Sequence, residues 1–114
     1  MARKRGLPDD FTVDQWQRCL DYFNHCCAVC GRQMKDLFGT HTVAMDHWIP
    51  LSSPDCPGTV AHNIVPLCHG EGGCNNSKGA KIPETWLKKR FGGRKAKAIV
   101  ARIEAYFDWL RQQG

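Results

Sequence analysis

The stretch AMDHWIPLSSPDCPGTVAHNIVPLC, residues 44–68, decides how this chain is read. One apolar run ends in Asp46 and His47, and a second run begins at Asn63 and ends in Cys68. A pair of core strands does not need an acid, an imidazole and an amide at its ends. These residues therefore indicate a small reactive site built on two adjoining strands.

Two strands are expected around this stretch, over residues 41–46 and 63–68, because β-branched and apolar residues are enriched there. The gap between them is too long for a tight hairpin turn, so a connecting loop is expected from about residue 50 to residue 62. Pro66 cannot donate a ladder hydrogen bond, which places the second strand at a sheet edge.

Helices are expected on both sides of the strand pair. Thr12 and the Gln three residues later form a capping-box pattern, and the helix that they begin should end near Asn24. A short helix should open with Asn75 near its start, and another should begin at Pro83. Gly92 and Gly93 interrupt that helix, and a last amphipathic helix covers residues 94–112. The sequence therefore predicts an α+β fold.

Composition is that of an ordinary soluble globular chain, with 114 residues, 42% hydrophobic and 24% charged. We expect one domain over residues 1–114, with a basic tail at 1–8, a core motif at 27–79 and a helical segment at 83–113. No apolar run approaches the roughly 20 residues of a membrane span. The N-terminus lacks the apolar segment of a secretory signal, so we expect a cytoplasmic protein.

The net charge of +5 is concentrated in two clusters, MARKR at residues 1–5 and KKRFGGRKAK at residues 88–97. A solvated tail would explain the first cluster alone, whereas two clusters around one site favour a polyanionic partner, most simply nucleic acid. The basic residues expected to contact phosphates are Arg3, Lys4, Arg5, Lys78, Lys88, Lys89, Arg90, Arg94, Lys95 and Lys97.

Seven cysteines without an export signal favour a metal site over a disulfide framework. CAVC supplies Cys27 and Cys30, and CHGEGGC supplies Cys68 and Cys74, each pair beside glycine-containing turns. Four thiolates on two turns are typical of structural zinc, which leaves no open position for chemistry. The second spacing is longer than usual, so Cys26 or His69 stays open as an alternative ligand.

DHWIPLS, HNIVPLC and CNNSKG, bracketed by CAVCG, together resemble the HNH endonuclease family, over residues 27–79. The resemblance implies a zinc-stapled ββα-metal core flanked by N- and C-terminal helices. It also implies a prokaryotic or phage-like enzyme that cuts DNA to 5′-phosphate and 3′-hydroxyl ends. Asp46 would bind a divalent metal, His47 would be the general base, and Asn63 would order the loop. Asn75 falls where the family often has its last histidine, which makes the chain an H-N-N variant.

The chemistry is consistent with this resemblance. A histidine with an ordinary pKa of about 6.5 suits the deprotonation of water near neutral pH. Asp46 and the Asn75 carbonyl are oxygen ligands that suit Mg²⁺ or Mn²⁺, with Asn76 as the competitor of Asn75. Neighbouring strand residues point to opposite faces, so a strand end or a bulge is needed between Asp46 and His47.

Two other functions remain open from sequence alone. One is a zinc-stabilised module that binds DNA without cutting it, and the other is a nuclease that processes RNA. Target specificity is also open. The oligomeric state is open as well, because one active site per chain nicks one strand, and cutting both strands needs a dimer, a larger complex or two separate encounters with the DNA.

Overall fold

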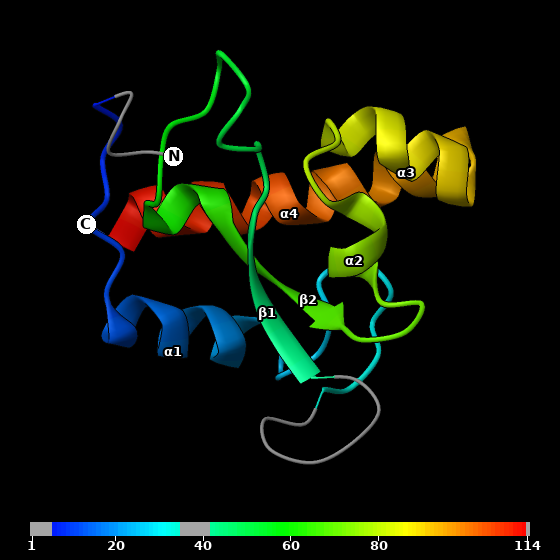
Figure 1. Ribbon diagram of the computed structural model, residues 1–114. Helices are drawn as coiled ribbons and strands as arrows, with labels where there is room; N and C mark the ends of the chain where they lie inside the picture. The colour runs from blue at the N-terminus through cyan, green and yellow to red at the C-terminus, as the bar shows by residue number, and fades with distance from the viewer. Residues whose placement is uncertain (1–5, 35–41, 114) are drawn as a thin grey trace.

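The computed structural model of the chain describes residues 6–34 and 42–113. Its elements are α1 (Val13–Tyr22), β1 (Thr42–His47), η2 (Ala61–Asn63), β2 (Ile64–His69), α2 (Cys74–Lys78), α3 (Pro83–Phe91) and α4 (Gly93–Gln113) (Figure 1). Two antiparallel strands are followed by a helix, and helices flank them on both sides in the sequence. The α+β fold class is therefore confirmed.

The hairpin of β1 and β2 contains most of the stretch at residues 44–68. His47 pairs with Ile64 at one end, and Thr42 pairs with His69 at the other. Each strand ends one residue later than expected, and His41 lies outside the described residues. Asn63 belongs to the 3₁₀ turn η2, because the backbone must change direction there before β2 begins to pair with β1. Among the described residues the sheet has only these two strands, so Pro66 lies on an edge strand as predicted.

The first helix follows the expected capping box. The backbone N–H of Gln15 donates to Thr12 Oγ1 at 3.1 Å, and the backbone N–H of Thr12 donates to Gln15 Oε1 at 2.9 Å. Phe23 caps the other end, and Asn24 then adopts a φ of 55° that no α-helix continues. The helix starts one residue after the expected position and ends two residues before it, which is within the usual uncertainty of helix limits.

The C-terminal helices support the hairpin from behind. Figure 1 shows α4 running behind the strands, with α1 near its C-terminal end and α3 along its N-terminal part. Pro83 occupies the first turn of α3, Gly92 ends it at a φ of 85°, and α4 begins at the next residue. Tyr106 of α4 is fully buried, with its ring centroid 4.9 Å from that of Phe23. No helix in these described ranges combines the length and apolar character needed to cross a bilayer.

Candidate active site and cysteine cluster

Four cysteines converge where the hairpin meets the segment after α1. The thiol sulfurs of Cys27, Cys30, Cys68 and Cys74 all lie within 4.8 Å of one another, and those of Cys30 and Cys68 are 3.7 Å apart. Tetrahedral zinc with Zn–S bonds of about 2.3 Å requires sulfurs about 3.8 Å apart, whereas a disulfide requires about 2.05 Å. The cluster therefore fits a four-cysteine zinc site.

The backbone around the cluster joins three parts of the fold. The N–H of Ala28, inside the first cysteine turn, donates to the Pro66 carbonyl of β2 at 2.9 Å. Cys68 lies on β2 and Cys74 begins α2, and the Cys74 N–H donates to the Cys68 sulfur at 3.3 Å. A Cβ on Gly73 would lie 2.7 Å from the Cys68 carbonyl oxygen, so this close turn requires glycine. The cluster thus fastens β2, α2 and the segment after α1 together.

The two alternative ligands lie outside this cluster. Cys26 donates its thiol to the Asn24 carbonyl at 3.4 Å, and His69 Nδ1 is 3.1 Å from Asn75 Oδ1. Within the cluster, a hydrogen bond from the Cys74 thiol lowers the pKa of Cys27 to about 4 and raises that of Cys74. One sulfur of the set is therefore ready to be a thiolate, the form that binds metal.

Asp46 is buried against α2. Its side chain is 4% exposed, Asn75 Nδ2 donates to its Oδ1 at 3.1 Å, and Lys78 Nζ lies 3.0 Å from its Oδ2. Oδ2 is thus ion-paired with the Lys78 ammonium, which also donates to the His47 carbonyl at 3.0 Å. Burial raises the pKa of Asp46, while Lys78 and Asn75 oppose that rise. Both carboxylate oxygens of Asp46 therefore face positively polarised groups from α2.

His47 ends β1, and its ring contacts the loop that follows the strand. Its Nε2 lies 2.9 Å from Thr59 Oγ1, on the loop that leads to η2. If Nε2 carries the proton and donates it to Thr59, the Nδ1 lone pair is free to accept another. Burial lowers the pKa of His47, and the positive charge of Lys78 lowers it further. The negative charge of Asp9 raises the pKa but does not cancel these effects. The imidazole is therefore biased towards its neutral, basic form.

Asn63 is completely buried and holds the segment that follows His47. Its Oδ1 accepts from the Ile49 N–H at 2.8 Å, and its Nδ2 donates to the carbonyls of Ile49 and Gly58, each at 3.1 Å. Its own carbonyl accepts from the Trp48 N–H at 2.8 Å. This side chain thus joins the two ends of the loop, the geometry that a loop-ordering residue requires.

Asn75 and its neighbour Asn76 face different surroundings. Asn75 contacts Asp46 through its amide nitrogen and His69 through its oxygen. Asn76 is exposed, and its Oδ1 accepts from the Gly70 N–H at 2.8 Å, which supports the second cysteine turn. Of these two asparagines, Asn75 contacts Asp46 and Asn76 does not.

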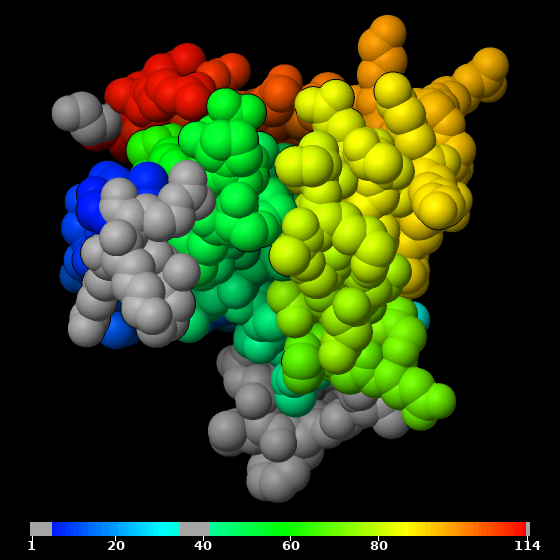
Figure 2. Space-filling view, turned by 45° about the horizontal axis from the view of Figure 1, so that its top comes forward, coloured from blue at the N-terminus to red at the C-terminus, as the bar shows by residue number. Residues whose placement is uncertain are grey.

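Asp46, His47 and Asn75 line one pocket of about 460 Å³, which we name the reaction pocket. Its other lining residues are Met45, residues 50–52, Gly79 and Ala80. Figure 2 shows the two segments that form it, the green one around residues 45–60 and the yellow-green one around residues 74–85, side by side on one face. Neighbouring strand residues normally point to opposite faces. Because His47 is the last residue of β1, both Asp46 and His47 line this pocket.

The basic residues selected from the sequence have several different settings. Arg3, Lys4 and Arg5 lie outside the described residues. Lys78 is fully buried and paired with Asp46, which does not match a surface contact to phosphate. Lys88 and Lys97 line a hollow that also contains Glu84, whereas Lys89 and Arg90 line a different pocket. Arg94 and Lys95 are exposed in the first turn of α4.

The sequence did not predict that Thr59 contacts His47 or that Lys78 is the buried partner of Asp46. Thr59 reaches His47 across a loop, and nothing local distinguishes it from any other loop threonine. Lys78 falls one turn after Asn75, so the short helix already predicted there could have placed both on one face. A lysine is rarely buried without a partner, and Asp46 is that partner.

The resemblance to HNH endonucleases is confirmed by a comparison with known proteins. The chain is 31% identical over 90 residues to the "SPbeta prophage-derived putative HNH endonuclease YoqL" of Bacillus subtilis (strain 168). The match covers 75% of this chain and 37% of that protein, so the chain spans just over a third of the relative's length. No family model matches the chain. No solved structure matches it either.

Proposed function

We propose that this chain is a metal-dependent endonuclease that hydrolyses DNA phosphodiester bonds, with His47 as general base and Asp46 and Asn75 as ligands of a divalent ion. The single observation that carries the proposal is the reaction pocket, where a carboxylate, an imidazole and an amide meet from β1 and α2. The similarity to the Bacillus subtilis protein named as a putative HNH endonuclease supports this proposal.

In the proposed reaction, His47 Nδ1 accepts a proton from water, and the hydroxide oxygen bonds to phosphorus. The bond from phosphorus to the 3′ oxygen then breaks, that oxygen takes a proton from solvent, and 5′-phosphate and 3′-hydroxyl ends remain. Thr59 holds the imidazole through Nε2, and Asn63 holds the backbone that follows His47. The low pKa of His47 keeps the base unprotonated at neutral pH.

The donor set fits a hard cation. Asp46 supplies a buried carboxylate with Asn75 beside it, and an ion at Asp46 Oδ2 would take the place of the Lys78 ammonium 3.0 Å away. The Asn75 oxygen now accepts from His69, so its use as a ligand requires a half-turn of the amide. Mg²⁺ or Mn²⁺ would supply positive charge against the scissile phosphate and the departing oxygen. Zinc in the cysteine cluster would have a structural role alone.

Supercoiled plasmid and a labelled RNA of matched length, each incubated with Mg²⁺, separate this proposal from its two alternatives. We expect nicked plasmid and intact RNA. Plasmid binding without cutting would favour a zinc-stabilised DNA-binding module, and preferential RNA cutting would favour an RNA-processing nuclease. Either result would contradict the proposal. Sedimentation of the protein with and without DNA would show whether one chain or a dimer acts.

A further inference from the structure

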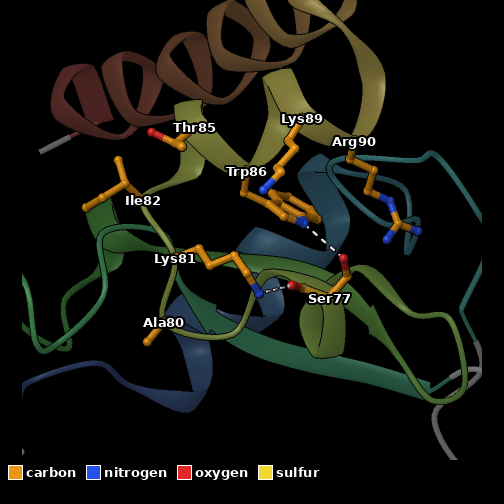
Figure 3. A pocket seen from close by; sticks show the side chains of 8 residues that line it. All are labelled: Ser77, Ala80, Lys81, Ile82, Thr85, Trp86, Lys89 and Arg90. Atoms are coloured by element: carbon orange, nitrogen blue, oxygen red, sulfur yellow. Dashed lines mark hydrogen bonds between the residues drawn. The ribbon is translucent and has the colours of Figure 1, made fainter.

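A second pocket, of about 600 Å³, lies beside the reaction pocket, and we name it the basic pocket. It is formed by the end of α2, the turn that follows and one face of α3 (Figure 3). Three of its eight lining residues are cations, Lys81, Lys89 and Arg90, and none carries a negative charge. All three cations are exposed. The pocket is therefore suited to an anion.

The inner wall of the basic pocket is held in place by its own contacts. Trp86 is 4% exposed, and its indole N–H donates to Ser77 Oγ at 2.9 Å. Lys81 Nζ donates to the Ser77 carbonyl at 2.8 Å, and the Arg90 guanidinium lies 5.9 Å from the centre of the Trp86 ring (Figure 3). These contacts fix two of the three cations before any ligand arrives, which reduces the entropy lost on binding.

The basic pocket and the reaction pocket share one lining residue. Ala80 lines both, and Gly79 before it lines the reaction pocket. Gly79 has no side chain and Ala80 has only a methyl group, so neither residue has a long side chain that could separate the two pockets. A strand with one phosphate at His47 could therefore extend its next sugar and phosphate across Ala80.

We infer that the basic pocket binds the phosphodiester backbone of the DNA strand beside the bond that is cut. This inference rests on the proposed function and specifies where its substrate lies. Lys81 and Lys89 contact phosphate oxygens, while exposed Ile82 and the edge of Trp86 face the sugar. Such contacts position a strand without reading its sequence. Lys81 enters this set although it lies outside both basic clusters of the sequence.

The neighbouring lysines of α3 provide a matched test. Lys89 lines the basic pocket, whereas Lys88 lines the separate hollow that contains Glu84. Binding of a short DNA duplex is measured for Lys81→Ala, Lys89→Ala and Lys88→Ala, each in a His47→Ala background so that no DNA is cut. Arg102→Ala removes the same charge from an exposed position of α4 and is the control. Titrations run from about 50 to 200 mM salt.

We expect Lys81→Ala and Lys89→Ala each to weaken binding roughly three- to tenfold and to flatten the slope of log K against log salt by about 0.9. Lys88→Ala should have a smaller effect on both quantities, and Arg102→Ala should change neither. Equal slopes for the Lys88 and Lys89 variants would overturn the inference, as would parent protein that prefers single-stranded or duplex RNA to DNA.

Plasmid cleavage by the parent distinguishes the two levels of the proposal. A parent that binds DNA through Lys81 and Lys89 but leaves plasmid intact supports the basic pocket and refutes the nuclease. A parent that cuts plasmid while the Lys81 and Lys89 variants bind like the control refutes the basic pocket and supports the nuclease.

Discussion

The Lys78 ammonium lies 3.0 Å from Asp46 Oδ2, and neither side chain is more than 5% exposed. The same ammonium donates to the His47 carbonyl at 3.0 Å, so one lysine joins α2 to both adjacent residues of the reaction pocket. Lys78 thus supplies the positive charge that compensates the buried carboxylate.

Lys78→Met should therefore destabilise the protein by about 3–5 kcal/mol, because it leaves the Asp46 charge buried without a partner. Urea unfolding at fixed zinc concentration measures the change. Lys95→Met, at an exposed position of α4, should stay within about 0.5 kcal/mol of the parent. Mg²⁺ should raise the unfolding temperature of Lys78→Met more than that of the parent, since the ion replaces the lost charge. Equal responses to Mg²⁺ would contradict the cation site at Asp46.

The cysteine cluster predicts one tightly held zinc per chain, measurable by elemental analysis of purified protein. Cys30→Ser should lower zinc content and thermal stability, because metal binding at such a site is coupled to folding. Cys26→Ser is the matched control one residue before the cluster, and it should retain both, because the Cys26 thiol donates to the Asn24 carbonyl and does not belong to the cluster. Zinc loss from Cys26→Ser would show that the ligand set has been assigned wrongly.

Most of the scaffold could be predicted from the sequence because its signals are local. The capping box at Thr12, Pro83 at the start of a helix and the spacing of Cys27 and Cys30 each act over a few residues. The burial of Lys78 could not be predicted in this way. It depends on which face of α2 meets β1, and on a carboxylate that is 32 residues earlier in the chain.

Asn63 illustrates the same limit within the candidate site. The family pattern indicates a loop-ordering asparagine, but its bonds to Ile49 and Gly58 depend on the path of a long loop. That path is fixed partly by residues before α1: the Thr59 N–H donates to the Pro8 carbonyl at 2.9 Å. No local pattern in the loop predicts a partner so far away in the sequence.

His47→Ala should abolish nearly all cleavage while zinc content, fold and DNA affinity remain. The imidazole is the proposed base, it does not belong to the cysteine cluster, and it is not among the lining residues of the basic pocket. Single-turnover cleavage, elemental analysis and duplex binding measure the three properties. General-base loss is worth about 10²–10⁴-fold in rate. A His47→Ala protein that cuts plasmid as fast as the parent would refute the mechanism.

We propose that Thr59 positions His47 through the contact at 2.9 Å, and Thr59→Val tests this role with nearly the same side-chain volume. Loss of the hydrogen bond to Nε2 should lower kcat on the order of tenfold, the equivalent of about 1.4 kcal/mol. Thr59→Ser keeps the hydroxyl and should restore most of the rate. A purely structural defect would lower thermal stability in parallel with kcat. Equal kcat values for the Thr59→Val and Thr59→Ser variants would contradict the positioning role.

The last prediction concerns the catalytic ion and follows from the setting of Asn75. Asp46 and Asn75 offer only oxygen ligands, and hard ions that keep several waters fit such a set. We therefore expect cleavage with Mg²⁺ and Mn²⁺ and little with added Zn²⁺. Asn75→His replaces the amide with an imidazole nitrogen and should shift the preference towards Ni²⁺ or Zn²⁺.

Asn75→Ala removes a ligand and should raise the Mg²⁺ concentration required for half-maximal cleavage. Asn76→Ala is the matched comparison from the next position of α2, where the side chain supports the Gly70 turn and does not contact Asp46. Asn76→Ala should lower zinc retention or thermal stability and should leave the Mg²⁺ requirement of the remaining folded protein unchanged. Metal titrations of the parent and the three variants measure these effects. If Asn76→Ala abolished cutting with zinc retained while Asn75→Ala left the Mg²⁺ requirement unchanged, the ligand would be Asn76.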